Sequence, residues 1–215
     1  MNEAHTLALS IWTQALEQLP LVAILRGLTP PEARDIGQML VDEGWRLIEV
    51  PLNSDDPLRS IALLREHFSQ ALIGAGTVLT VEDVRNVHAA GGLWVVSPHF
   101  DPAVVRESLA LDLLCVPGVC TPSEAFAALA LGAHALKVFP AEMITPAVLK
   151  AWRSVIPRQR LLLPVGGIGV DNLAAYRRAG ASGAGVGSSL YKPGMSPAQV
   201  SAGAQALAKA WHSAQ

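Results

Sequence analysis

The stretch Ala133-His-Ala-Leu-Lys137-Val-Phe-Pro140 predicts a buried parallel strand with a lysine inside it. Leu136 and Val138 flank the ammonium group, and proline suits the end of a strand, where a main-chain donor can be lost. Because burial disfavours the charged amine, we expect a lowered Lys137 pKa and a lone pair that can attack a carbonyl. A lysine that snorkels, or that pairs structurally with a carboxylate, is the alternative interpretation of this stretch alone.

Seven further apolar runs resemble this one, and the starts of all eight lie about 20 to 27 residues apart, as in strand-plus-helix units. The eight runs are residues 21–25, 47–50, 71–75, 93–97, 113–116, 135–139, 161–165 and 184–187. Helical patterns fill the intervals at residues 31–43, 57–68, 81–90, 102–110, 123–131, 145–155 and 171–179. Continuously apolar strands predict a parallel sheet covered on both faces, and eight units predict a (β/α)8 TIM barrel. A doubly wound sheet is the alternative, disfavoured because no early Gly-x-Gly-x-x-Gly turn is present.

The 215 residues are expected to form a single α/β domain, because barrels of this length commonly stay undivided. Residues 1–19 carry amphipathic helical spacing and are expected to form an extra N-terminal helix that covers one end of the barrel. Residues 20–193 would form the barrel, and residues 194–215 a C-terminal helix.

Composition excludes several classes of protein. Hydrophobic residues make up 51% and charged residues 16%, which argues against disorder, and a net charge of −2 gives no basic footprint for nucleic acid. No apolar run approaches the roughly 18 residues of a membrane helix. The first residues lack the basic region of a signal peptide, so we expect a cytoplasmic protein in which Cys115 and Cys120 are buried free thiols. A regulatory disulfide between them is the alternative.

Polar residues near the strand ends are candidates for a site, because chemistry in such barrels gathers where strands meet the following loops. Glu49 interrupts the second strand, where burial should raise its pKa and make it a general acid or base. The alternative is that Glu49 is a structural partner of Lys137 or Arg26. Arg26 follows the first strand and could clamp a carboxylate or phosphate, or be a plain surface arginine. Thr77 offers a hydroxyl after the third strand, with a helix N-cap as the alternative, and Pro98 would form a wall.

The last two strands end in glycine-rich turns, Pro164-Val165-Gly166-Gly167 and Val186-Gly187-Ser188. Bare backbone N–H groups at a helix N-terminus bind anions, and the loops after strands seven and eight of such barrels often form a phosphate site. The alternative is that the glycines only relieve packing.

The histidines do not cluster, so no metal and no cofactor is assigned.

A lysine nucleophile, a buried glutamate and a phosphate cradle together suggest Schiff-base chemistry on a small phosphorylated carbonyl compound. The segments Ile-Glu49-Val-Pro-Leu-Asn53-Ser, Gly-Ala-Gly-Thr77-Val-Leu, Leu-Lys137-Val-Phe-Pro and Val165-Gly-Gly-Ile resemble the class I 2-keto-3-deoxy-6-phosphogluconate aldolase family. The resemblance covers about residues 20 to 193. Phosphogluconate members usually carry an arginine where Asn53 stands and often a threonine where Val165 stands, so the chain is most similar to members acting on the galactonate epimer.

This resemblance implies cleavage of 2-dehydro-3-deoxy-6-phospho-D-galactonate to pyruvate and D-glyceraldehyde 3-phosphate, in a protein that is typically a homotrimer. It implies Lys137 as the Schiff-base lysine, Glu49 as the proton carrier and Arg26 as the carboxylate clamp. The residues that would line the pyruvate pocket, alter the epimer preference or hold the phosphate are Thr77, Pro98, Phe139, Val165, Gly166, Gly167, Gly187 and Ser188.

Three other functions stay open at this point. The first is a sister aldolase acting on the gluconate epimer or on 4-hydroxy-2-oxoglutarate. The second is a sugar-phosphate epimerase, which needs metal ligands or paired acids that the sequence does not offer. The third is a non-catalytic sugar-phosphate-binding barrel, for which a buried lysine would be an expensive feature.

Overall fold

The structure is a computed structural model that describes residues 3–214. Met1, Asn2 and Gln215, which the sequence assigns to the first and last helices, lie outside the described residues. The helices are α1 Glu3–Gln18, α2 Pro30–Asp42, α3 Pro57–His67, α4 Val81–Ala89, α5 Pro102–Ala110, α6 Pro122–Ala130, α7 Pro146–Trp152, α8 Val170–Arg178 and α9 Pro197–His212. The strands are β1 Leu21–Ile24, β2 Leu47–Pro51, β3 Leu72–Gly76, β4 Trp94–Val96, β5 Leu114–Val116, β6 Gly118–Val119, β7 Leu136–Val138, β8 Leu162–Pro164 and β9 Ala184–Val186.

All paired strands are parallel, which confirms the expected α/β class. They form two sheets, one of six strands in the order β5-β4-β3-β2-β1-β9 and one of three in the order β6-β7-β8, rather than one sheet of eight. The extra strand arises at Pro117, which separates β5 from β6 because proline cannot donate a ladder hydrogen bond. A single parallel bridge between Val165 and Gly185 links the end of β8 to β9.

The helices begin where the local sequence provides a cap. Thr80 accepts a hydrogen bond from Asp83 N at the start of α4, and Asp101 accepts one from Ala103 N at the start of α5. Proline occupies the first turn of α2, α3, α5, α6, α7 and α9, where its missing N–H costs nothing. These signals place the starts of α2 to α8 within one residue of the sequence-based expectation, whereas α9 begins at Pro197, inside the expected range 194–215.

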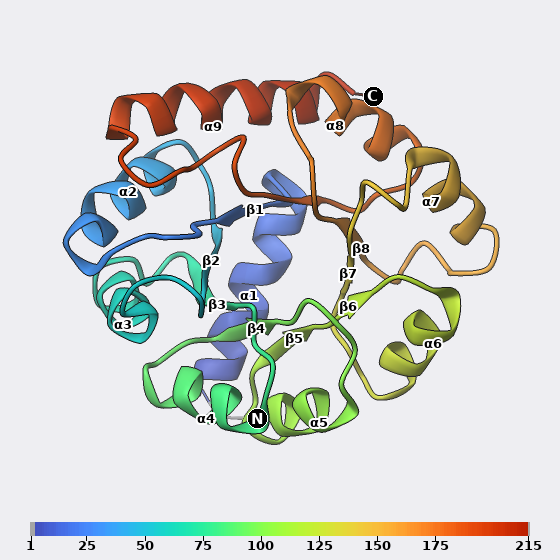
Figure 1. Cartoon of the computed structure of the whole chain (residues 1–215), viewed down its shortest axis with the longest axis horizontal. Coiled ribbons are helices and arrows are strands. Elements are labelled where there is room, and N and C mark those ends of the chain that lie inside the picture. Colours follow the sequence, from blue (N-terminus) through green and yellow to red (C-terminus); the bar gives the residue numbers. More distant parts are fainter. Residues whose placement is uncertain (1–2, 215) are drawn as a thin grey trace.

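Two hydrophobic layers hold the sheet in place. The outer layer packs the strands against the surrounding helices α2–α9, which Figure 1 shows outside the ring of strands. The inner layer gathers strand residues such as Val22, Leu47 and Leu114 together with Trp12 of α1. The rings of Trp12 and Trp94 lie 6.0 Å apart, and Figure 1 shows α1 crossing the middle of the ring. Because these partners include the first residues of several strands, α1 covers the amino-terminal end of the ring. The sequence predicts a helix over one end without specifying which.

Two further expectations concern the membrane and the cysteines. Within residues 3–214, no helix has the length and apolar character that a membrane crossing requires. Cys115 is a buried free thiol, and its burial raises its pKa to about 12. Cys120 is also a free thiol but is only partly buried, because it follows β6 directly in an exposed loop, so the expectation of burial is right for Cys115 alone.

Candidate active site

Lys137 lies at the centre of β7, and its main-chain N–H donates to Pro117 O at 2.9 Å. The residue is 5% exposed, and its side chain lines a narrow interior space together with Val22, Val96 and Val116. Its Nζ lies 5.0 Å from the centroid of the Phe139 ring. The lysine of the opening stretch is therefore buried inside the ring and does not snorkel to the surface.

Glu49 lies on β2, is 2% exposed, and lines the same interior space as Lys137. Its carboxylate rests against Gly76 at the end of β3, where an added methyl group would overlap Glu49 Oε1. Gly76 thus has to lack a side chain so that the carboxylate can occupy this position. Among residues 3–214 the one ion pair within 4.0 Å joins Arg85 to Glu107, so Lys137 and Glu49 face one space without forming an ion pair of that length.

Burial dominates the electrostatics of both groups. It lowers the pKa of Lys137, while Glu49 raises that pKa and Arg26 lowers it. Burial raises the pKa of Glu49, against the opposite influence of Lys137 and Arg26. The lowered pKa makes the uncharged amine of Lys137 easier to form near neutral pH than in an ordinary lysine. The raised pKa lets the Glu49 carboxyl group hold a proton nearer to neutral pH than an ordinary glutamate does.

Arg26 follows β1, and its Nη1 donates to Asn53 Oδ1 at 2.8 Å. Asn53 comes just after β2, so this bond joins the carboxyl ends of two neighbouring strands. The adjacent Gly27 N donates to Ser54 Oγ at 2.9 Å and strengthens the same connection. The side chain of Arg26 is exposed and oriented by a neutral partner, which leaves its charge available to an anion.

The two glycine turns enclose a cavity of about 140 Å³. Its lining contains most of the residues predicted to bind substrate, namely Arg26, Phe139, Val165, Gly166, Gly167, Gly187 and Ser188. Ile24, Val165 and Gly185 line both this cavity and the interior space of Lys137 and Glu49, so the two spaces adjoin.

The turn after β8 has a backbone conformation that depends on its two glycines. Gly166 and Gly167 have φ values of 111° and 61°, which side-chain-bearing residues rarely adopt. The turn leads into the N-terminus of α8, where the helix dipole favours an anion. Glu142 lies over the turn, since a methyl group on Gly166 would overlap its Oε2.

Thr77 and Pro98 are half-buried and do not line either of these two spaces. Thr77 has φ 57° and follows β3 directly, whereas Thr80 is the N-cap of α4, so the N-cap alternative for Thr77 is wrong. A methyl group on Gly118 would overlap the Pro98 carbonyl, which places Pro98 against β6. Their roles at the pyruvate pocket stay predictions.

Sequence reasoning missed two residues that shape the site. Asn53 orients Arg26. It could have been found from the sequence, because it follows the end of a strand, which is the reason that Arg26 was chosen as a candidate. Asn172 accepts from Gly169 N at 3.0 Å and donates to Gly167 O at 2.8 Å, which holds the glycine turn to α8. Its position three residues after Gly169, as in a capping box, was a signal that could have found it. Within residues 3–214, no group of three or more His, Cys, Asp or Glu side chains is placed to hold a metal ion.

Comparison with known proteins finds similar sequences and similar structures. Residues 13–202 match the family model described as "Aldolase: KDPG and KHG aldolase". The chain is 46% identical over 182 residues to a probable 2-dehydro-3-deoxy-6-phosphogalactonate aldolase of Rhizobium meliloti, covering 84% of this chain and 86% of the relative. It is 40% identical over 198 residues to the Escherichia coli 2-dehydro-3-deoxy-6-phosphogalactonate aldolase, covering 92% and 97%. The solved structure described as "Native KDPGal structure" superimposes with a TM-score of 0.89 at 40% identity, over 92% of this chain and 96% of that one.

Proposed function

The chain belongs to the KDPG and KHG aldolase family, and from this premise we propose that it is a class I aldolase that cleaves 2-dehydro-3-deoxy-6-phospho-D-galactonate. The products are pyruvate and D-glyceraldehyde 3-phosphate. The relatives named for the galactonate substrate support this choice over the gluconate epimer. The proposal rests above all on the buried Lys137 amine, which shares one interior space with Glu49 beside the glycine-lined cavity.

The reaction begins when Lys137 Nζ attacks the C2 ketone of the substrate. Loss of water gives a protonated Schiff base, whose positive nitrogen can accept an electron pair. Glu49, directly or through a water molecule, removes the proton of the C4 hydroxyl as the C3–C4 bond breaks. The bonding pair moves to C3 and gives an enamine, while C4 becomes the aldehyde of D-glyceraldehyde 3-phosphate.

The second half of the reaction returns the enzyme to its starting state. Glu49 delivers a proton to C3 of the enamine, and water then hydrolyses the resulting Schiff base. Pyruvate leaves, and the Lys137 amine is regenerated. The lowered pKa of Lys137 supports this cycle because the amine must be unprotonated to attack, and the raised pKa of Glu49 supports proton transfer in both directions.

The surrounding residues hold the two ends of the substrate. Arg26, oriented by Asn53, binds the carboxylate, and Phe139 packs beside the Schiff base. Thr77 and Pro98 complete the pyruvate pocket. The main-chain N–H groups of the two turns hold the phosphate, with the residues Gly166, Gly167, Gly187 and Ser188. Val165, which lines both spaces, lies between the reacting carbons and the phosphate and influences the choice of epimer.

The fold and assembly belong to the same proposal. The strand segments form one closed eight-stranded barrel within a single domain, if β5 and β6 count as one strand interrupted at Pro117 and the Val165–Gly185 bridge closes the ring. The enzyme is a cytoplasmic homotrimer. Exposed apolar side chains, Met143 at 69% and Phe126 at 46%, are surfaces that subunit contacts would cover.

Borohydride trapping tests the chemistry. Reduction in the presence of pyruvate is expected to leave a covalent adduct on Lys137 in the full-length protein and none in Lys137→Met. An adduct of equal yield on another lysine, such as the exposed Lys150, would contradict the assignment. Cleavage assays with the galactonate epimer, the gluconate epimer and 4-hydroxy-2-oxoglutarate then identify the substrate, and the galactonate compound should give the highest kcat/KM.

A further inference from the structure

A second cavity, of about 380 Å³, lies apart from the candidate active site and is strongly basic. Its lining consists of Lys150, Arg153, Arg158, Arg177, Arg178, Ala179, Gly180, Ala181 and Ser182, with no acidic residue among them. None of these residues lines the spaces around Lys137 or the glycine turns. Ser182 stands just before β9, and its Oγ accepts from Leu162 N at the start of β8. The pocket therefore adjoins the amino ends of the two strands whose carboxyl ends carry the glycine turns.

Arg153 is rigidly built into this pocket. Its Nε donates to Gly180 O at 2.8 Å, and its Nη2 donates to Ser182 Oγ at 2.8 Å. Its Nη1 donates to the carbonyl oxygens of Pro157 and Arg160 at 3.1 and 2.7 Å. All four partners are neutral, so the guanidinium is held in a defined orientation while its positive charge stays uncompensated.

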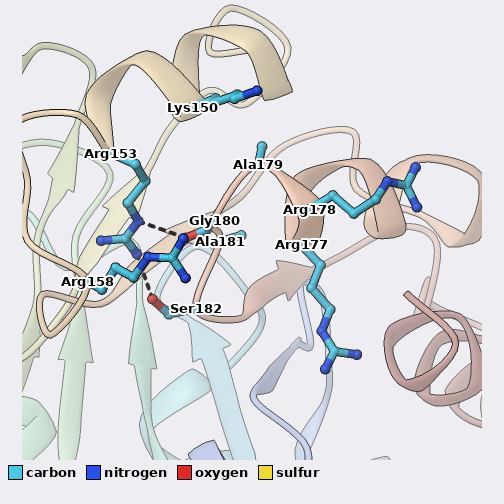
Figure 2. Close-up of a pocket in the computed structure, with 9 residues that line it drawn as sticks. All are labelled: Lys150, Arg153, Arg158, Arg177, Arg178, Ala179, Gly180, Ala181 and Ser182. Atoms are coloured by element: carbon cyan, nitrogen blue, oxygen red, sulfur yellow. Dashed lines mark hydrogen bonds between the residues drawn. The ribbon is translucent and has the colours of Figure 1, made fainter. Parts of the chain in front are cut away.

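Arg158 adds a second positive charge beside the first. Arg158 lines the same pocket as Arg153, Gly180 and Ser182, and Figure 2 labels all four residues. Burial lowers the pKa of Arg153, and the like charge of Arg158 lowers it further. Across residues 3–214, neither arginine has a carboxylate within 4.0 Å. An anion that bridges the pair would relieve this repulsion.

Helix ends explain the other cations of the pocket but not Arg158, since Arg153 is the C-cap residue of α7. Lys150 lies in the last turn of α7, and Arg177 and Arg178 lie in the last turn of α8, where positive charge stabilises the helix dipole. Arg177 also donates to Trp211 O and stacks 4.8 Å from the Trp211 ring, and Figure 2 shows it pointing away from Arg153. Arg158 lies in the turn beyond α7 and has neither of these roles.

We propose that this pocket binds a compact anion with two or more phosphate groups, such as a polyphosphate or a small bisphosphorylated molecule. The Arg158 guanidinium presents paired donors that match phosphate oxygens. Arg153 adds a fixed positive charge and one remaining Nη2–H, because its other four N–H groups already bind protein oxygens, and Lys150 and Arg178 also line the pocket. The volume suits a small ligand rather than a single phosphate. The lining offers no aromatic ring on which a nucleobase could stack, which favours a ligand without a base.

Calorimetric titration of the full-length protein with inorganic tripolyphosphate in 150 mM KCl tests this inference. The unmodified protein should show saturable binding, and Arg158→Gln should weaken it about tenfold, the size expected for losing one charge-assisted hydrogen bond. Arg106→Gln, at an exposed position on α5, removes the same charge outside the pocket and should leave binding unchanged. Aldol cleavage by Arg158→Gln should keep the unmodified kcat and KM.

Binding at the candidate phosphate cradle is a separate outcome of the same titration. Gly166→Ala disturbs that cradle but not this pocket, so tripolyphosphate affinity should survive in it. The inference is overturned if the unmodified protein shows no saturable binding, if Arg158→Gln and Arg106→Gln behave alike, or if only Gly166→Ala loses the ligand. None of these results bears on the aldolase assignment, which depends on Lys137.

Discussion

Arg26 Nη1 donates to Asn53 Oδ1 at 2.8 Å, so a neutral amide orients the cation at the mouth of the site. A carboxylate in place of Asn53 would neutralise Arg26, and an apolar residue would leave it free to rotate. The amide instead limits the rotamers of Arg26 while preserving its charge for the substrate. Asn53 is thus a positioning residue for the proposed carboxylate clamp.

Asn53→Ala is expected to raise the KM for substrate about tenfold, because one hydrogen bond that orients Arg26 is lost. The pyruvate concentration that gives half-maximal trapping should rise by the same factor. The kcat should change little, since Asn53 does not reach the reacting carbons. Steady-state kinetics and pyruvate-concentration-dependent trapping measure both effects. Asn86→Ala, at an exposed position on α4, is the matched control and should behave like the unmodified protein. An unchanged KM in Asn53→Ala would remove the positioning role.

Glu49→Gln should separate Schiff-base formation from bond cleavage. The variant keeps Lys137 and should still trap pyruvate, but its kcat for cleavage should fall about 10²- to 10⁴-fold because the proton carrier is gone. Glu66→Gln, an exposed residue on α3, serves as the control. If Glu49→Gln cleaves the substrate at full rate, another group carries the proton.

The pH dependence of trapping should report the environment of Lys137. The amine attacks only when unprotonated, so the trapping rate at saturating pyruvate should rise with pH to a midpoint below the value of about 10.4 for ordinary lysine. Glu49 raises the Lys137 pKa, so Glu49→Gln should move the midpoint to lower pH. Arg26 lowers that pKa, so Arg26→Gln should move it to higher pH. One common midpoint near that of free lysine would show that the amine is not desolvated in solution.

Gly166→Ala should damage the phosphate end of the site selectively. Alanine at φ 111° is strained and would also meet Glu142, which should distort the turn before α8. We expect a KM for the phosphorylated substrate at least about tenfold higher, with pyruvate trapping unaffected. Gly91→Ala, at φ 80° with no atom within 4 Å of the added methyl, controls for backbone strain alone. Equal kinetic losses in both variants would mean that backbone strain, and not damage to the phosphate cradle, causes the loss in Gly166→Ala.

Val165→Thr tests the origin of epimer preference. A hydroxyl at this position would face the spaces shared by Lys137, Glu49 and the glycine turns. The ratio of kcat/KM for the gluconate epimer over the galactonate epimer should rise about tenfold, since a site that hydrogen-bonds a substrate hydroxyl discriminates by its orientation. Val170→Thr, exposed at the start of α8, is the control. A ratio that stays constant in Val165→Thr would place the discrimination elsewhere.

Local signals account for the part of the fold that could be predicted. Thr80, Asp101 and Thr121 begin helices through hydrogen bonds to residues two or three positions away, so their effect can be predicted without the tertiary structure. The division of one expected strand into β5 and β6 was not predicted. Pro117 is visible in the sequence, but only the tertiary structure shows that β5 pairs with β4 in one sheet and β6 with β7 in the other.

The sequence by itself determined the alternation of parallel strands and helices, the burial of Lys137 and Glu49, and the glycine turns, because each depends on side-chain type and spacing within a few residues. Only the tertiary structure decided that Lys137 on β7 and Glu49 on β2 face one interior space, and that Asn53 holds Arg26. It also decided that Arg153, at the end of α7, binds Gly180 and Ser182 before β9 in a basic pocket. The physical reason is that these contacts join different elements, and their geometry is set when the strands pack around a shared core.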